Sequence, residues 1–231
     1  MKNKDKIKIL LVDDEEDILD LLEYNLIKDG YEVRTCKNGK EAIEVVKEFF
    51  PHLIILDIMM PVLDGIETCR RIKDMPEFSK TYIIVLTARN EEYSEVAAFD
   101  AGADDFIPKP VKPKALLSRL ASIFKRERKK DENSQATIYI RNLKIDRNTY
   151  MVYKDEKSYV LPRKEFELLF FLAANPKKVF NRDELLQKIW GTDVYVLSRT
   201  VDVHVRKVRE RLGEDFIKTI KGVGYKFDDE D

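Results

Sequence analysis

The stretch that decides the fold lies in the first half of the chain and reads His52-Leu53-Ile54-Ile55-Leu56-Asp57. Its uninterrupted apolar run predicts a strand buried on both faces, as in a parallel sheet covered by helices. The strand ends in a single carboxylate, Asp57, and Pro61 follows four residues later. Open parallel sheets bind ligands at the carboxyl ends of their strands, so Asp57 is a candidate site residue.

Polar side chains end three other predicted strands. Asp13 and Asp14 follow the apolar run at 7–12, and Thr87 and Lys109 end two later strands. Together with Asp57 they are the groups needed to hold a divalent cation and a phosphoryl group beside a nucleophilic carboxylate. The alternative is that the acids from 13 to 17 complement a helix dipole. That alternative does not explain an ionised pair directly at a buried strand end, where carboxylates repel unless a cation neutralises them.

The first half alternates short β-rich runs with amphipathic helical stretches. This pattern predicts a doubly wound α/β domain with a five-stranded parallel sheet. We expect strands near 7–12, 31–35, 53–57, 82–87 and 104–107.

The second half follows a charged and polar segment at 125–135, which predicts a linker. We therefore expect domains at 1–124 and 136–231. The pattern after the linker predicts an α+β winged helix-turn-helix domain, with strands near 137–140, 143–146, 149–153 and 158–161, helices near 163–174, 182–190 and 199–212, and a hairpin at 216–227.

Composition limits the class of protein. The 231 residues are 44% hydrophobic and 37% charged, with no apolar run of membrane-spanning length and no signal-peptide core at the start. We expect a cytoplasmic protein with no membrane partner. Cys36 and Cys69 lack the spacing of a zinc site or a disulfide framework and are expected to be packing residues.

Charge differs between the two halves. Residues 1–124 carry a net charge of −6, whereas 125–135 carry +2 and 136–231 carry +3. The last four residues are all acidic, so residues 136–227 carry +7. An acidic front and a basic back predict that only the second half meets a polyanion.

Four motifs in the first half carry a family resemblance. They are Val12-Asp13-Asp14-Glu15, Leu56-Asp57-Ile58-Met59-Met60-Pro61 with Asp64-Gly65, Leu86-Thr87-Ala88-Arg89, and Gly102-Ala103-Asp104-Asp105-Phe106-Ile107 with Lys109-Pro110. Residues 7–124 thereby resemble the flavodoxin-like receiver domain of two-component response regulators, which implies the strand order 2-1-3-4-5.

The resemblance also implies roles for single residues. Asp57 would accept a phosphoryl group from a sensor histidine kinase, assisted by Thr87 and Lys109. Thr87 and Phe106 would carry the switch, although the family often has Tyr where this chain has Phe106. The implied Mg²⁺ ligands are Asp13, Asp14, Asp57 and the backbone carbonyl of Met59.

The predicted helix at 199–212 has one apolar stripe and several basic residues. Its inward positions are Val201, Val205, Val208 and Leu212. A basic amphipathic helix is often only a solvated face. Here it follows a helix and a turn, and a hairpin bearing Lys221 and Tyr225 comes next, which favours a nucleic-acid interface. His204 has no neighbouring metal ligands, so we expect it to face DNA.

Residues 138–227 resemble the winged-helix effector domain of the OmpR/PhoB family. Four stretches carry the resemblance: three start at Leu161-Pro162, Val179-Phe180 and Arg199-Thr200, and the fourth is the wing motif Thr219-Ile220-Lys221-Gly222-Val223-Gly224-Tyr225. The resemblance implies binding to double-stranded promoter DNA, with RNA polymerase as a further candidate partner. The expected DNA-binding residues are Arg199, Thr200, His204, Arg206, Lys207, Arg209, Thr219, Lys221 and Tyr225.

The family pairs its receivers through the fourth helix, fifth strand and fifth helix. The positions of one customary ion pair are here Glu95 and Ala115, which cannot form it. We expect a homodimer on phosphorylation by the same face, with Arg119 meeting an acid of the partner. The expected interface residues are Asp100, Asp104, Asp105, Arg119, Val96 and Leu116.

These observations predict a non-enzymatic response regulator that controls transcription. Three alternatives stay open. An Asp-nucleophile, Mg²⁺-dependent phosphatase or phosphotransferase commonly has a second acid two residues after its nucleophile, where this chain has Met59. A regulator could also act independently of phosphorylation, and a protein-binding adaptor with a winged helix would show no salt-dependent DNA affinity.

Overall fold

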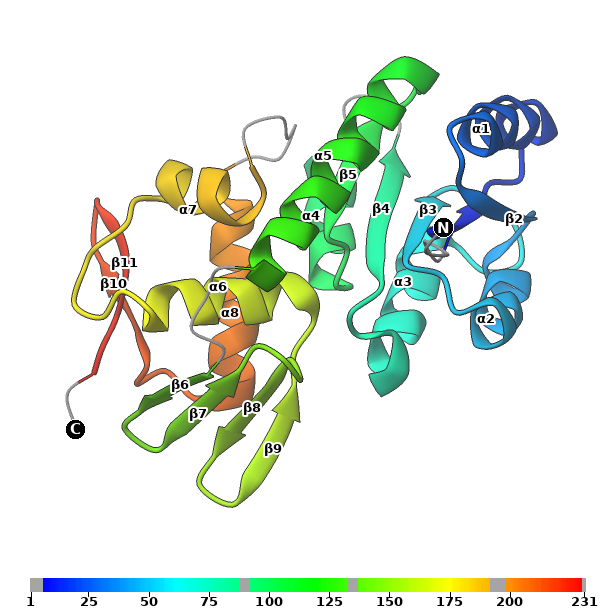
Figure 1. Ribbon diagram of the computed structural model, residues 1–231. Helices are drawn as coiled ribbons and strands as arrows, with labels where there is room; N and C mark the ends of the chain where they lie inside the picture. The colour runs from blue at the N-terminus through cyan, green and yellow to red at the C-terminus, as the bar shows by residue number, and fades with distance from the viewer. Residues whose placement is uncertain (1–5, 88–91, 133–136, 192–197, 230–231) are drawn as a thin grey trace. The chain divides into compact units, whose positions relative to one another are not determined.

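The computed structural model describes residues 6–87, 92–132, 137–191 and 198–229 (Figure 1). The chain divides into two compact units, Met1–Glu132 and Asn133–Asp231. In the described residues no helix is both long and apolar enough to cross a membrane.

The first unit is built on a five-stranded sheet in which every neighbouring pair is parallel. The strand order is β2-β1-β3-β4-β5, which confirms the predicted doubly wound topology. Its strands are β1 (Lys8–Val12), β2 (Glu32–Cys36), β3 (Leu53–Asp57), β4 (Tyr82–Thr87) and β5 (Asp105–Pro108).

Helices cover both faces of this sheet (Figure 1). They are α1 (Glu16–Lys28), α2 (Gly39–Phe49), α3 (Gly65–Asp74), α4 (Glu92–Asp100) and α5 (Pro113–Glu132), with a short 3₁₀ turn at Pro76–Phe78. On one face, apolar residues of α1 and α5 pack against the sheet in a single core cluster. Asn38 and Asp64 cap α2 and α3 by accepting hydrogen bonds from the Glu41 and Glu67 amides, so polar residues fix where these helices begin.

The central strand is buried as its sequence predicts. Residues 53–56 are each at most 1% exposed. Burying each such side chain contributes about 1.5–3 kcal/mol relative to leaving it in water. Strand β3 therefore holds Asp57 at the sheet edge on a rigid support.

Helix α5 differs from the sequence prediction, because it continues to Glu132 and includes the first eight residues of the expected linker at 125–135. Lys, Arg and Glu are good helix formers. The buried side chains of Leu116, Leu120 and Ile123 anchor the preceding turns on the sheet. A run of good helix formers can therefore extend a helix that is already nucleated.

The second unit starts with a four-stranded antiparallel sheet of order β6-β7-β8-β9. Among the described residues of this unit, three helices and a two-stranded antiparallel hairpin follow, which matches the predicted winged helix-turn-helix pattern. The elements are β6 (Thr137–Ile140), β7 (Leu143–Asp146), β8 (Met151–Lys154), β9 (Lys157–Val160), α6 (Arg163–Ala173), α7 (Arg182–Ile189), α8 (Thr200–Leu212), β10 (Ile217–Ile220) and β11 (Gly224–Phe227).

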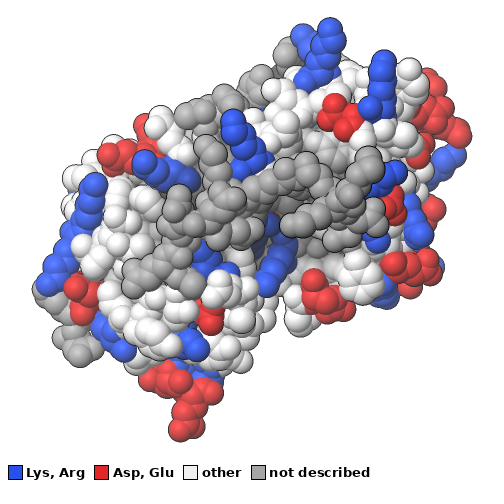
Figure 2. Space-filling view, in the orientation of Figure 1, with Lys and Arg blue, Asp and Glu red and all other residues white. Residues whose placement is uncertain are grey.

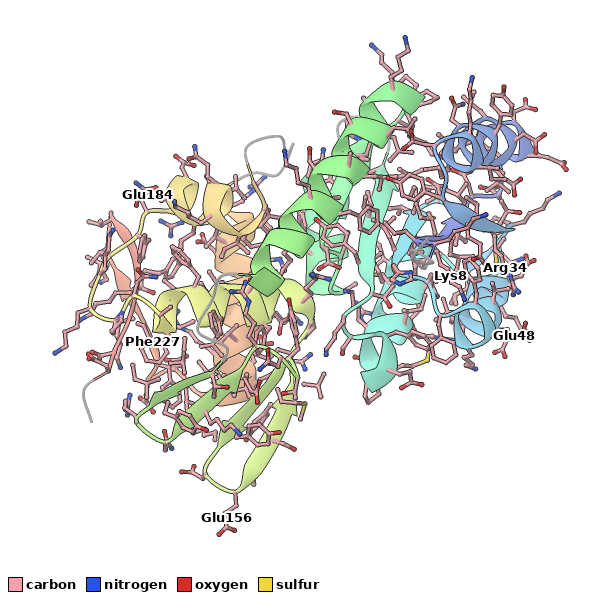
Figure 3. All side chains as sticks on the ribbon, in the orientation of Figure 1. Lys8, Arg34, Glu48, Glu156, Glu184 and Phe227 are labelled. Carbon is pink, nitrogen blue, oxygen red and sulfur yellow. The ribbon has the colours of Figure 1, made fainter. Side chains whose placement is uncertain are left out.

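The start of α7 is fixed by a reciprocal cap. The Asn181 side-chain oxygen accepts a hydrogen bond from the backbone N–H of Glu184. In return, the Glu184 carboxylate accepts one from the backbone N–H of Asn181 (Glu184 is labelled in Figure 3). Phe227 of β11, also labelled, is fully buried and lies 6.1 Å from the Phe216 ring, centroid to centroid. The cap and this aromatic contact hold both ends of the segment that carries the candidate DNA-binding elements.

Candidate functional site

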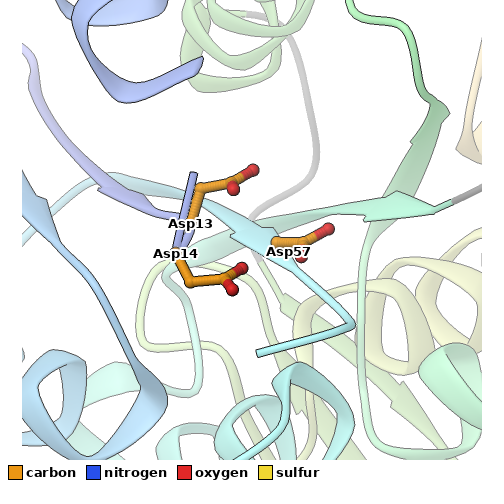
Figure 4. Close-up of side chains that lie close together, drawn as sticks. All are labelled: Asp13, Asp14 and Asp57. Carbon is orange, nitrogen blue, oxygen red and sulfur yellow. The ribbon is translucent and has the colours of Figure 1, made fainter. Parts of the chain in front are cut away.

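Three carboxylates meet at the carboxyl edge of the first sheet (Figure 4). One oxygen each of Asp13, Asp14 and Asp57 lies within 4.8 Å of the other two. They meet because β1 and β3 are neighbours in register, with Val12 opposite Leu56, so the residues that follow emerge side by side. Asp13 and Asp57 are only 2% and 3% exposed, whereas Asp14 is exposed.

The Lys109 ammonium joins this cluster from the end of β5. Its Nζ lies 2.9 Å from Asp13 Oδ2 and 3.0 Å from Asp57 Oδ1. Thr87 is buried at the end of β4, and its carbonyl accepts a hydrogen bond from the Lys109 amide at 2.7 Å. The structure thus brings together the residues that the strand-end argument selected.

Glu15 is a member of this cluster that the sequence argument missed. Its Oε1 lies 3.1 Å from Lys109 Nζ, and its amide donates to Asp13 Oδ1 at 3.0 Å. The sequence explanation for Glu15 was the dipole of α1. Its direct adjacency to the Asp13-Asp14 pair was the signal that could have found it.

The electrostatics of the cluster favour a cation. Burial raises the pKa of Asp57 above its usual value, and the hydrogen bond from Lys109 only partly offsets that effect. Burial acts to lower the pKa of Lys109, but hydrogen bonds to Asp13 and Asp57 outweigh it, so that pKa lies above its usual value. One ammonium cannot neutralise three close carboxylates, and hard oxygen donors in this number fit Mg²⁺ or Ca²⁺.

The loop after β3 is held tightly against the strand. The Gly65 amide donates to the Ile58 carbonyl at 2.9 Å, and a Cβ on Gly65 would lie 2.0 Å from the Asp57 carbonyl oxygen. Only glycine allows this approach. Met59, the residue whose carbonyl the family resemblance assigns to the metal, has an exposed side chain on the same loop.

The predicted switch residues both lie inside the domain. Thr87 and Phe106 are each 4% exposed. The Phe106 ring meets Phe99 of α4 edge to face at 6.0 Å, centroid to centroid. In this structure Phe106 therefore occupies an interior position beside α4.

The side chains of several expected dimer contacts are buried or paired within the first unit. Arg119 forms a two-pronged pair with Asp105, with Nε 2.7 Å from Oδ2, and both side chains are buried. Asp104 is also buried and accepts from the Lys73 ammonium at 2.7 Å. Leu116 lies in the core at 2% exposure.

Other members of the predicted dimer face are not buried in this way. Val96 on α4 is 38% exposed. Asp100 at the end of α4 is half-buried. The Glu95 side chain lies outside the described residues, and Ala115 is exposed near the start of α5.

On α8 the apolar stripe faces inward as predicted. Two of the expected DNA-facing residues are wrong, since they also lie inside: Thr200 is 4% exposed and His204 is 1% exposed. The His204 ring packs against Trp190, with 5.0 Å between ring centroids. His204 precedes Val205 on the helix, and the wide buried face needed to cover Trp190 includes it.

Five expected DNA-binding residues keep a surface position in the second unit. Arg206 is exposed with Glu210 at 3.7 Å, and Lys207 is partly exposed with the same carboxylate at 3.8 Å. The three other exposed residues are Arg199 before α8, and Thr219 and Lys221 on the hairpin. In the face drawn in Figure 2, Lys and Arg lie interspersed with Asp and Glu.

Two further expected DNA contacts are used inside the domain. Arg209 donates to the Ile217 carbonyl at 2.6 Å and to Thr219 Oγ1 at 2.8 Å. Tyr225 is 5% exposed, and its hydroxyl donates to Asp202 Oδ1 at 2.6 Å. Both residues hold the hairpin against α8 in this structure.

Comparisons with known proteins agree with both halves. Residues 9–121 match the model of the response regulator receiver domain, and residues 156–227 match that of the C-terminal domain of transcriptional regulatory proteins. The chain is 41% identical to the phosphate regulon transcriptional regulatory protein PhoB of Rhizobium meliloti, covering 94% of this chain and 97% of that one. It is 39% identical to the alkaline phosphatase synthesis transcriptional regulatory protein PhoP of Bacillus subtilis, covering 96% and 97%.

Solved structures show the same architecture. The response regulator DrrB, a Thermotoga maritima OmpR/PhoB homologue, is 36% identical with a TM-score of 0.50, covering 96% of this chain and 99% of that one. A cysteine mutant of RitR is 28% identical with a TM-score of 0.76 and covers the same shares, 96% and 99%. With near-complete coverage by such relatives and both domain models matched, this chain belongs to the OmpR/PhoB family of response regulators.

Proposed function

We propose that Asp57 is the phosphoacceptor of a two-component system and takes its phosphoryl group from a phosphohistidine of a sensor kinase. The observation that supports this is the position of Asp57 between an acid pair and the Lys109 ammonium, at the end of a rigid strand. An Asp57 oxygen attacks phosphorus, the phosphorus–nitrogen bond breaks, and the leaving imidazole takes a proton. The product is an acyl phosphate on Asp57.

The surrounding residues supply positioning and charge. Asp13, Asp14, Asp57 and the Met59 carbonyl would hold Mg²⁺, which neutralises phosphoryl oxygens when bound. Lys109 contacts Asp57 directly and places a second positive charge at the same point. Position 59 offers no carboxylate to act as acid or base, which favours a phosphoacceptor over an enzyme with rapid turnover.

Labelling tests the phosphoacceptor. The full chain with Mg²⁺ and acetyl phosphate should gain one alkali-labile phosphate, and Asp57→Ala should gain none. Asp17→Ala is the matched control, because Asp17 is an exposed acid on the first turn of α1. Full labelling of Asp57→Ala would assign the phosphate to another residue.

We further propose that phosphorylation is transmitted by Thr87 and Phe106. The Thr87 hydroxyl can donate to the new phosphoryl oxygens and draw its loop inward, and Phe106 then fills the vacated space. Thr87→Ala should still accept phosphate but should no longer change DNA affinity on phosphorylation. An unaltered response in Thr87→Ala would remove this residue from the switch.

The proposed output is promoter binding by α8 and the β10–β11 wing, through Arg199, Arg206, Lys207, Thr219 and Lys221, with RNA polymerase as a further candidate partner. Helix α8 would enter the major groove while the wing reaches neighbouring phosphates. Lys221→Ala should weaken binding to all sequences and lower the slope of log affinity against log salt by about 1. If Arg206 reads a base, Arg206→Ala should instead lower the binding free energy by about 1–3 kcal/mol at one position of the DNA site. Equal DNA affinity of wild type and a variant with both Arg206→Ala and Lys221→Ala would exclude this surface.

We also propose that the phosphorylated protein dimerises through the face of α4, β5 and α5 and binds two half-sites about one helical turn apart. Val96 is an exposed apolar residue on α4, and its exposure supports this face as the interface. Sedimentation with and without beryllofluoride should show a dimer only with it, and Val96→Glu should abolish that dimer. A monomer in both states, or DNA affinity indifferent to beryllofluoride, would favour a phosphorylation-independent regulator.

A further inference from the structure

One acid stands out on the helix proposed to bind DNA. Asp202 lies in the first turn of α8 and its side chain is 42% exposed, so its charge should repel a polyanion. Its carboxylate nevertheless has two close partners from two other elements. Arg182 Nε of α7 lies 2.7 Å from Asp202 Oδ1, and the Tyr225 hydroxyl of β11 lies 2.6 Å from the same oxygen.

The three residues form a closed set of contacts. A guanidinium nitrogen of Arg182 lies 3.4 Å from the Tyr225 hydroxyl, and the Arg182 guanidinium carbon lies 5.2 Å from the centre of the Tyr225 ring. Burial, then the hydrogen bond to Asp202, raises the pKa of Tyr225 to about 12, so its hydroxyl keeps the proton that it donates. One residue from each of α7, α8 and β11 thus meets at a single carboxylate oxygen.

The backbone reinforces the same junction. Tyr225 exchanges two 2.9 Å backbone hydrogen bonds with Phe180, the residue two positions before α7. Gly224 allows this approach, because a Cβ there would lie 2.0 Å from the Phe180 carbonyl oxygen. Further along α8, Arg209 binds the Ile217 carbonyl of β10. The wing is therefore tied to α8 at two separate points, one on each strand of the hairpin.

We propose that Asp202 is a positioning residue for DNA recognition, which acts through Tyr225 and Arg182 to fix the wing relative to α8. This inference rests on the proposed DNA-binding function of the two elements. A helix in the major groove and a wing on neighbouring phosphates must both fit one duplex, so holding them in place before binding reduces the entropy lost on association. Removing Asp202 should therefore weaken binding, although simple charge repulsion predicts the opposite.

Two variants distinguish the role of the Asp202 carboxylate as a hydrogen-bond acceptor from the effect of its negative charge. Asp202→Ala and Asp202→Asn both remove the negative charge, but only Asn keeps an oxygen that Tyr225 and Arg182 can donate to. The probe is a 30-base-pair duplex selected from random DNA by the wild-type full chain with beryllofluoride bound, and every variant is measured in the same state. We expect Asp202→Ala to bind it about threefold to tenfold more weakly than Asp202→Asn.

A double-variant cycle tests whether Asp202 acts through Tyr225. Tyr225→Phe removes only the hydroxyl and keeps the ring, so it should fold. If Asp202 acts through that hydroxyl, combining Tyr225→Phe with Asp202→Ala should weaken binding much less than the product of the two separate effects. Multiplicative effects would overturn the proposal, as would equal affinities of Asp202→Ala and Asp202→Asn.

Controls distinguish a failure of the proposed role of Asp202 from a failure of the DNA-binding function itself. Glu214→Ala removes an exposed acid just after α8 and should bind the duplex no more weakly than wild type. Melting temperatures confirm that each variant is folded. If wild-type protein with beryllofluoride bound selects no duplex above its affinity for poly(dI-dC), the DNA-binding function fails. If it selects a duplex that the Asp202→Ala and Asp202→Asn variants bind equally well, only the role of Asp202 is rejected.

Discussion

At the scale of single residues, the phosphoacceptor loop depends on the absence of a side chain at Gly65. An added Cβ would lie 2.0 Å from the Asp57 carbonyl oxygen, which is backbone and cannot rotate away. We expect Gly65→Ala to lower the free energy of unfolding by about 1–3 kcal/mol, the range for overpacked sites. Denaturant titration of both proteins measures this loss. An unchanged midpoint would show that the loop relaxes freely around the added methyl group.

The two thiols give a pH-dependent prediction. Burial raises the pKa of Cys36 and of Cys69 to about 12. At pH 8 only on the order of 1 in 10⁴ of each thiol is then ionised, and the thiolate is the reactive form. A thiol reagent should label neither residue in native protein at pH 8 and both in denaturant. Rapid labelling of native protein would contradict their buried positions.

At the scale of elements, β5 and α5 are joined by the buried Asp105–Arg119 pair. Arg119→Ala leaves the Asp105 carboxylate buried without its ionic partner, because Asp105 is 0% exposed. We expect a loss of about 3–5 kcal/mol in the free energy of unfolding. Lys47→Ala is the control: it breaks the exposed Lys47–Glu44 pair and should cost about 0.5 kcal/mol or less.

The Asp105–Arg119 pair also makes Arg119→Glu unsuitable as a test of the dimer interface. This variant would place two acids together in the interior and should unfold the first unit. Near-wild-type stability of Arg119→Ala would contradict the buried pair. It would also return Arg119 to the set of candidate dimer contacts.

At the scale of the whole molecule, each compact unit has its own buried core. We expect calorimetry of the full chain to resolve two transitions, because separate cores melt separately. Mg²⁺ at 100 times its dissociation constant should increase the free energy of unfolding of the first unit by about 2.7 kcal/mol. Only the transition temperature of that unit should therefore rise. Asp13→Ala with Asp14→Ala should abolish that shift, while an equal shift of both transitions would place cations elsewhere.

The sequence alone determined the parallel sheet and the acidic site. A run such as Leu53–Leu56 has one stable placement, a strand covered on both faces, and acids that follow such strands must emerge at the same edge. The apolar stripe of α8 likewise fixed which side of that helix is buried. These features are local or periodic, so they can be read from a single chain.

Only the tertiary structure decided which polar side chains form pairs within each domain. Asp105 with Arg119, Asp104 with Lys73, and Tyr225 with Asp202 are each separated by 14 or more residues in the chain. Nothing in the sequence around Arg119 or Tyr225 distinguishes a residue that faces a partner from one that satisfies a buried acid. Burial forces polar groups to find partners within the fold, and which partners they find depends on packing between distant elements.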